Sequence, residues 1–89
     1  MNLSMHHVYV IQSERTNELY FGRTKDLKQR LADHNAGRTK STRDSRPWQY
    51  VYIESYRSKQ DAVDREKQLK QYGNARTYLK DRIERSADL

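Results

Sequence analysis

The sequence has 89 residues, of which 34% are hydrophobic, and this leaves too little apolar material for two independent cores, so we expect one domain over residues 1–89. The absence of cysteine excludes disulfides, thiolate nucleophiles and thiolate metal ligands, and no apolar stretch approaches the ~20 residues of a membrane span. The formal net charge of +6 favours a polyanionic partner. Met1–Val10 lacks the apolar core of a secretory signal, so a cytoplasmic location without a membrane partner is expected.

The chain begins with two segments that are typical of strands. His7–Gln12 (HVYVIQ) and Glu18–Gly22 (ELYFG) are rich in β-branched and aromatic side chains. A hairpin that pairs Gln12 with Asn17, with Ser13–Thr16 as its four-residue loop, would place Tyr9 opposite Tyr20. Because opposed residues share one face of a sheet, the two tyrosines are expected to stand side by side.

A helix is predicted next, from Lys25 to Ala36, with Thr24 as its N-cap and Gly37 as its stop. Arg30 and His34 are four residues apart and therefore neighbours on the helix surface. They lie close to the line of Leu27 and Leu31 that faces the core, with His34 seven residues after Leu27. Both side chains can therefore reach the edge of the sheet.

A polar, basic segment without periodicity, Arg38–Pro47, is expected to be a surface loop, and a third strand follows at Trp48–Tyr56. The alternation in this strand predicts Val51 and Ile53 on one face of the sheet. The residues expected on the other face are Tyr50 and Tyr52.

Two further helices are predicted after the third strand. Ser58 and Asp61 form a capping box that opens a helix ending near Gly73, and a last helix runs from about Ala75 to Arg85. The order of elements, β-β-α-β-α-α, predicts an α+β fold with a small three-stranded antiparallel sheet flanked by helices.

Positive charge is concentrated in one block of the chain. Between Arg23 and Arg46, eight basic residues stand against three acidic ones. Nucleic acid is the commonest polyanion that such a face meets, although a merely solvated basic surface is the alternative. The residues expected to contact nucleic acid are Arg23, Lys25, Arg38, Lys40, Arg43 and Arg46.

Glu66 lies at an unusual place on the second predicted helix, three residues from both Val63 and Leu69 of its apolar stripe. An ionised carboxylate is costly to bury without a partner, so the group must be salt-bridged, protonated or coordinated to a cation. A structural salt bridge to Arg30 or Arg65 and a role as metal ligand are both open on this pattern.

Several of these residues together resemble the GIY-YIG nuclease family. Val8-Tyr9-Val10 and Tyr20-Phe21-Gly22 are similar to the two tripeptides that name the family. In that family the second tripeptide is followed by a helix with an arginine and often a histidine one turn on, which Arg30 and His34 match, and later by a metal-binding glutamate, which Glu66 matches. The resemblance covers nearly the whole chain. It is closest to short, single-domain bacterial members, which are similar to the N-terminal nuclease domain of the excision-repair protein UvrC.

The chain departs from the family pattern at three motif positions. His7 stands in place of the first glycine, and Val8 and Phe21 replace isoleucines. Packing decides the side chain at such positions, so we expect activity to survive, with His7 altering access to the site. Thr42-Arg43 and Arg46-Pro47, before the third strand, are also similar to the short members.

The resemblance implies an endonuclease that hydrolyses DNA phosphodiester bonds with one Mg²⁺ or Mn²⁺ ion, on single-stranded or branched DNA, in repair or recombination. Glu66 would hold the ion, and Arg30 would bind the phosphate through its forked donors. Tyr9 would be the general base, with its pKa lowered by nearby positive charge, and Tyr20 would orient the water or phosphate. His34 would bind phosphate or transfer a proton to the leaving group.

A non-catalytic nucleic-acid-binding module that keeps the fold is the alternative function. On that interpretation Tyr9 and Tyr20 are an ordinary aromatic cross-strand pair and His34 is a packed core residue.

Overall fold

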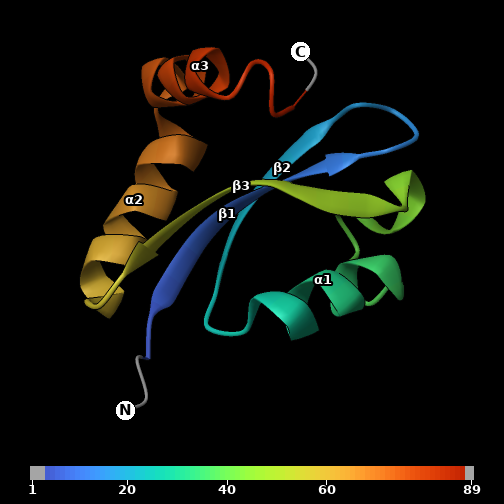
Figure 1. Ribbon diagram of the computed structural model, residues 1–89, viewed down its shortest axis with the longest axis horizontal. Helices are drawn as coiled ribbons and strands as arrows, with labels where there is room; N and C mark the ends of the chain where they lie inside the picture. The colour runs from blue at the N-terminus through green and yellow to red at the C-terminus, as the bar shows by residue number, and fades with distance from the viewer. Residues whose placement is uncertain (1–3, 88–89) are drawn as a thin grey trace.

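The computed structural model describes residues 4–87 and shows a three-stranded antiparallel sheet with helices on both faces (Figure 1). The predicted α+β class and the order β-β-α-β-α-α are confirmed. Residues 1–3 and 88–89 of the expected domain lie outside the described residues. None of the helices within 4–87 combines the length and the apolar character needed to cross a bilayer. The elements are β1 (His6–Ser13), β2 (Leu19–Thr24), α1 (Leu27–Asn35), a short 3₁₀ helix η1 (Arg43–Ser45), β3 (Trp48–Tyr56), α2 (Lys59–Gln71) and α3 (Gly73–Arg82).

The hairpin of β1 and β2 has a different register from the predicted one. Tyr9 lies opposite Gly22, and Tyr20 lies opposite Ile11, so the predicted cross-strand pair of Tyr9 and Tyr20 is wrong. The register differs by two residues, and a shift of two keeps the parity of the side chains. Tyr9 and Tyr20 therefore still lie on one face of the sheet, as diagonal rather than direct neighbours.

The loop of the hairpin explains this register. It has the predicted four residues but starts one residue later, because the Ser13 amide donates to the Glu18 carbonyl oxygen (2.9 Å). The Ser13 hydroxyl accepts hydrogen bonds from the amides of Arg15 (3.1 Å) and Thr16 (2.9 Å). Asn17 closes the loop with a φ of 64°, a conformation that asparagine tolerates better than most residues.

The side chains of β1 alternate between two apolar clusters on opposite faces of the sheet. Val8 and Val10 belong to the α2-side cluster, whose buried members are Val8, Val10, Phe21, Ala62, Leu69, Leu79, Ile83 and Ala87. Figure 1 shows α1 alone on the other face. The buried members of this α1-side cluster are Tyr9, Ile11 and Trp48, which pack against Leu27 and Leu31 of α1.

A β-bulge interrupts the pairing of β1 with β3. Val10 lies opposite Tyr52, but Ile11 lies opposite Tyr50, so β3 has one extra residue at this point. The predicted alternation of β3 is therefore wrong: Tyr50 packs against the α1-side cluster, whereas Val51 and Tyr52 pack against the α2-side cluster. The bounds of β3 are those predicted.

The first helix begins two residues later than predicted, and its N-cap is Asp26 rather than Thr24. Asp26 Oδ1 accepts a hydrogen bond from the Gln29 amide (3.0 Å). Thr24 is the last residue of β2, and its hydroxyl oxygen accepts from the Asp26 amide (3.1 Å) instead. The predicted stop is confirmed, because Gly37 takes a φ of 77° directly after the C-cap.

The predicted cap of α2 is confirmed, since the Ser58 hydroxyl accepts from the Asp61 amide (3.2 Å). Tyr72 has an extended backbone conformation and separates α2 from α3. The last helix starts at Gly73, two residues earlier than predicted, and ends at Arg82, three residues earlier.

Candidate active site

Tyr9 is the innermost tyrosine of the sheet, with none of its surface exposed. Its ring lies directly over Gly22, its partner on β2. A Cβ atom built on Gly22 would lie 2.4 Å from Tyr9 Oη and 2.5 Å from Tyr9 Cζ. The glycine of the second tripeptide is therefore required by the position of the tyrosine ring.

A chain of hydrogen bonds runs from α1 through Tyr9 into the loop before β3. Arg30 Nε donates to Tyr9 Oη (3.2 Å), and Tyr9 Oη lies 2.8 Å from His34 Nε2. His34 Nδ1 in turn lies 2.8 Å from Thr42 Oγ1. Because the Thr42 hydroxyl donates to the Thr39 carbonyl oxygen (3.4 Å), its oxygen is left to accept from His34 Nδ1–H. His34 Nε2 is then the acceptor for the Tyr9 hydroxyl.

Burial shifts the pKa values of both central groups toward their neutral forms. The pKa of His34 is lowered to about 4, first by burial and then by the Arg30 charge, so the imidazole is neutral at pH 7. Burial raises the pKa of Tyr9, although the hydrogen bond and charge of Arg30 oppose this effect. The expectation that nearby positive charge lowers the pKa of Tyr9 is therefore wrong for the protein alone, because Tyr9 is fully buried and desolvation outweighs Arg30.

Tyr20 connects the two helices that flank this region. It is half-buried on β2, and its ring meets the His34 ring edge-on with 5.2 Å between centroids. Lys70 of α2 places its Nζ atom 5.6 Å from the centroid of the Tyr20 ring. Tyr20 is thus in contact with α1 and with α2 at the edge of the sheet.

Glu66 is only partly buried, and its carboxylate is paired. Arg23 Nε lies 3.3 Å from Oε1 and Lys70 Nζ lies 3.1 Å from Oε2, while 21% of the Glu66 side chain is exposed. The alternative of a salt bridge to Arg30 or Arg65 is wrong, because α2 carries Glu66 over the edge strand β2 and directs Arg65 toward β3. The negative charge of Glu66 contributes to the raised pKa of Tyr9, so the two groups interact electrostatically.

Glu66 offers a carboxylate, which is the kind of oxygen ligand that a hard divalent cation binds. Within residues 4–87, no group of three or more His, Asp or Glu side chains could hold a metal ion. Mg²⁺ commonly keeps several waters and binds through one or two carboxylates together with substrate phosphates. The two cationic side chains at Glu66 show that this position already attracts positive charge, and they would have to yield to a metal ion.

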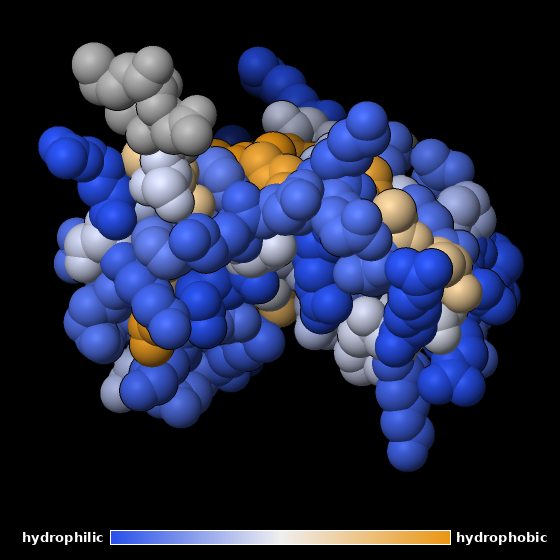
Figure 2. Space-filling view, turned by 90° about the horizontal axis from the view of Figure 1, so that it is seen from below, coloured by the Kyte–Doolittle hydropathy of each residue, from blue (hydrophilic) through white to orange (hydrophobic). Residues whose placement is uncertain are grey.

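The structure brings the five expected catalytic residues to one region from four elements. Tyr9, Tyr20, Arg30 and His34 meet on the α1 side of the sheet, and Glu66 lies at the β2 edge of the same region. Figure 2 views the molecule from the α1 side and shows a largely hydrophilic surface that is hollowed between its left and right parts. Figure 1, with the same horizontal direction, places α2 on the left and α1 on the right.

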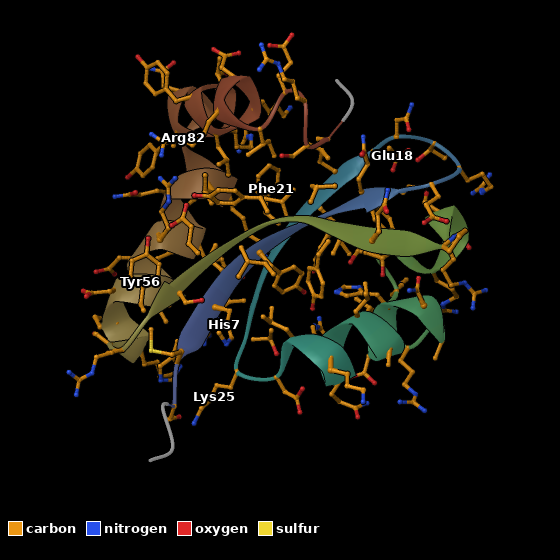
Figure 3. All side chains as sticks on the ribbon, viewed as in Figure 1. His7, Glu18, Phe21, Lys25, Tyr56 and Arg82 are labelled. Atoms are coloured by element: carbon orange, nitrogen blue, oxygen red, sulfur yellow. The ribbon has the colours of Figure 1, made fainter. Side chains whose placement is uncertain are left out.

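His7, which replaces the first glycine of the family motif, is two residues before Tyr9 on β1, so the two side chains lie on the same face of the sheet. Its Nδ1 atom lies 2.6 Å from the Ser55 hydroxyl oxygen on β3. In Figure 3 it lies near the N-terminal end of β1. The residue thus packs across the sheet toward β3, away from the β2 edge that carries Glu66.

The basic residues expected to contact nucleic acid fall into two groups at opposite ends of α1. Arg23 and Lys25 precede the helix, and the other four follow it in the loop before β3. Arg23 pairs with Glu66, and Arg38 pairs with Asp33 (2.7 Å). Among the residues that the structure describes, no carboxylate lies within 4.0 Å of Lys25, Lys40, Arg43 or Arg46.

Three residues of this region were given no role from the sequence. Gly22 could have been found from its place in the second tripeptide. Thr42 lies in a loop without periodicity, and nothing local indicates its contact with His34. Lys70 stands four residues after Glu66, a spacing that predicts an ion pair on a helix surface.

Comparison with known proteins identifies relatives over most of the chain. The family model of the GIY-YIG catalytic domain matches residues 5–79. The UPF0213 protein of Halobacterium salinarum is 43% identical over 72 residues, which cover 80% of this chain and 92% of the relative. The UPF0213 protein of Staphylococcus haemolyticus is 38% identical over 71 residues, covering 79% of this chain and 85% of the relative. The names of these archaeal and bacterial relatives state no activity. The chain therefore belongs to the GIY-YIG family, a family of nuclease catalytic domains that act on DNA.

Proposed function

We propose that this protein is a metal-dependent endonuclease that hydrolyses DNA phosphodiester bonds in the cytoplasm, on single-stranded or branched DNA during repair or recombination. The observation that carries the proposal is the hydrogen-bonded chain from Arg30 through Tyr9 and His34 to Thr42, set beside Tyr20 and Glu66. Hydrolysis needs a positioned base for the attacking water and positive charge for the phosphoryl oxygens, and Tyr9 and Arg30 would supply them.

Arg30 is the first group in the proposed reaction. Tyr9 is fully buried, so its hydroxyl meets a water molecule only when a neighbouring side chain moves. Arg30 is half-buried, and a phosphate offers its guanidinium a stronger, charge-assisted partner than a neutral phenol does. Movement of Arg30 to the scissile phosphate would uncover Tyr9 as the substrate arrives.

His34 would allow Tyr9 to act as a base despite the raised pKa of the phenol. The neutral imidazole accepts the Tyr9 hydrogen at Nε2 (2.8 Å). When Tyr9 Oη takes a proton from the attacking water, its own proton would pass to His34 Nε2, so that no isolated phenolate forms. Arg30, whose charge helps to lower the His34 pKa, would by then have moved to the phosphate. Thr42 holds the imidazole in the tautomer that this transfer requires. In this proposal His34 exchanges a proton with Tyr9 and not with the leaving group.

Glu66 is the residue that would hold a divalent cation, which would neutralise charge on the phosphoryl oxygens. Lys70, which pairs with Glu66 in this structure and lies near the Tyr20 ring, would then be available to the DNA backbone. Tyr20, half-exposed between Lys70 and His34, would orient the water or the phosphate.

The first prediction is that Glu66→Ala and Arg30→Ala each abolish Mg²⁺- or Mn²⁺-dependent cleavage and leave the protein folded. Because Glu66 is partly exposed and its ion pairs are close to solvent, its replacement should cost no more than about 1 kcal/mol of unfolding free energy. Cleavage of single-stranded, duplex, flap and Holliday-junction DNA, measured beside thermal melts, tests this expectation and identifies the preferred DNA structure.

Matched controls come from the same helices. Asp64→Asn removes an exposed carboxylate from α2, and Lys28→Ala removes an exposed cation from α1; both should cut DNA at the parental rate. Parental cleavage by Glu66→Ala would refute the nuclease mechanism. If neither the parent nor any variant cuts DNA while all bind it, the protein is instead a nucleic-acid-binding module that keeps the fold.

A further inference from the structure

A second polar region lies on the opposite face of the sheet from Tyr9. It is a pocket of about 650 Å³ between β3, α2 and α3. Tyr52, Glu54 and Tyr56 project from β3 into it, and Arg65 and Arg82 reach it from α2 and α3. Figure 3 shows Tyr56 and Arg82 on this α2/α3 side of the molecule. None of the five expected catalytic residues lines the pocket.

Glu54 organises the walls of the pocket. Its side chain is 13% exposed, and its carboxylate accepts from Arg65 Nε at 3.0 and 3.1 Å, from the Tyr52 hydroxyl at 3.0 Å and from the Tyr56 hydroxyl. Burial and the neighbouring carboxylate raise the pKa of Tyr56 to about 12, so the phenol stays neutral. The Glu54 carboxylate is thereby fully paired, and it holds the side chains of Arg65, Tyr52 and Tyr56 in place.

Two groups at the mouth of the pocket are left for a ligand. Tyr78 of α3 exposes 72% of its surface, so an aromatic ring faces water beside the cavity. Arg82 lies one turn further along α3, and no carboxylate of the described residues lies within 4.0 Å of its guanidinium. An exposed ring beside an available guanidinium is the arrangement that binds a base by stacking and its phosphate by charge.

We propose that this pocket binds one nucleotide of single-stranded DNA, with the base stacked on Tyr78 and the phosphate on Arg82. Bases in a duplex are already stacked and paired, whereas an unpaired base can enter a pocket of this size. Binding in the pocket should not depend on the base sequence, because every base can stack on an aromatic ring.

The position of the pocket suits a strand that extends from a branched substrate. Arg65 and Glu66 are adjacent on α2 but contact opposite edges of the sheet, Arg65 through Glu54 on β3 and Glu66 through Arg23 on β2. The pocket and the candidate active site therefore lie on the two sides of one helix. Binding in the pocket does not need the hydrolytic reaction, and the two proposals can fail separately.

Fluorescein-labelled hexathymidylate, measured by fluorescence anisotropy in EDTA so that no cleavage occurs, tests the proposal. Tyr78→Ala and Arg82→Gln should each weaken binding by about fivefold or more. The matched controls come from the same part of the chain but do not line the pocket: Tyr72→Ala removes a ring that is 61% exposed, and Lys80→Gln removes an exposed cation of α3. The controls should bind within about twofold of the parent.

Amide NMR shifts locate the ligand independently. Hexathymidylate should shift the amides of Ser55, Tyr78 and Arg82, all of which line the pocket. Equal losses in pocket and control variants, or shifts confined to the loop before β3, would overturn the proposal. The proposal would also be overturned if hexaglutamate bound as tightly as hexathymidylate and competed with it, because the pocket would then be a general anion site.

Discussion

His34 is a buried imidazole in which both nitrogens are used. Nδ1 donates to Thr42 and Nε2 accepts from Tyr9, so protonation of the ring would break one hydrogen bond and bury a charge beside Arg30. This accounts for the direction of its pKa shift, and it also makes the residue a pH-sensitive part of the fold.

The second prediction is a loss of stability on acidification that depends on His34. Its pKa is lowered from 6.5 in the unfolded chain to about 4 in the folded protein. The contribution of the neutral imidazole to the free energy of unfolding is therefore fully present above pH 6.5 and is lost as the pH falls toward 4. Between pH 7 and pH 5 this amounts to about 2 kcal/mol of unfolding free energy. Urea unfolding followed by Trp48 fluorescence measures it.

His34→Gln is the matched variant, because glutamine keeps a donor and an acceptor without titrating in this range. It should lose about 2 kcal/mol less than the parent between pH 7 and pH 5, whatever its stability at pH 7. An equal loss in both proteins would show that other groups cause the acid sensitivity.

At the scale of elements, the pairing of β1 with β2 positions the candidate general base. The register places Gly22 opposite Tyr9, and the missing Cβ provides the space in which the phenol meets His34 and Arg30. Thus β1 carries the tyrosine, and Gly22 on β2 leaves the space that its ring fills.

The third prediction is that Gly22→Ala displaces Tyr9 and removes cleavage. The added Cβ would lie 2.4 Å from Tyr9 Oη, so the ring must move, and overpacking of this kind costs about 1–3 kcal/mol. The Tyr9 ring signals in NMR spectra should shift, and cleavage should fall together with the contact to His34.

Gly73→Ala is its control. A Cβ at this exposed position would meet nothing closer than Arg76 Nη2 at 3.9 Å, so stability and cleavage should be unchanged or slightly improved. Parental activity in Gly22→Ala would show that the buried position of Tyr9 is not needed for the reaction.

At the scale of the whole molecule, the +6 charge is distributed around α1 more than over α2 and α3. The loop before β3 is tied to the candidate active site through Thr42, which contacts His34 by its hydroxyl and Trp48 Nε1 by its carbonyl oxygen (2.8 Å). Phosphates that bind this loop would therefore lie beside the catalytic region.

The fourth prediction is that DNA affinity falls steeply with salt, because bound phosphates release counterions when Lys40 and Arg43 contact them. Alanine at either position should weaken binding to all sequences about equally and reduce the slope of log K against log salt by about 1. Lys80→Ala on α3 is the control and should keep the parental slope on duplex DNA. A slope near zero for the parent would indicate a ligand other than nucleic acid.

The sequence alone determined the local features of this protein. It predicted the existence and order of all strands and α-helices, the bounds of β3 and the Ser58 cap, because side-chain periodicity and capping chemistry act within a few residues. The spaced motifs also indicated the family, which the comparison with relatives confirmed.

Only the tertiary structure decided how these features meet. The Ser13 cap shifted the hairpin register, and the bulge in β3 separated Tyr50 from Tyr52. The pairing of Glu66 with Arg23 joins residues 43 positions apart, and the contact of Tyr9 with His34 spans 25. Local patterns contain no information on such distances, since a one- or two-residue change of register or a bulge alters which side chains meet without changing any element.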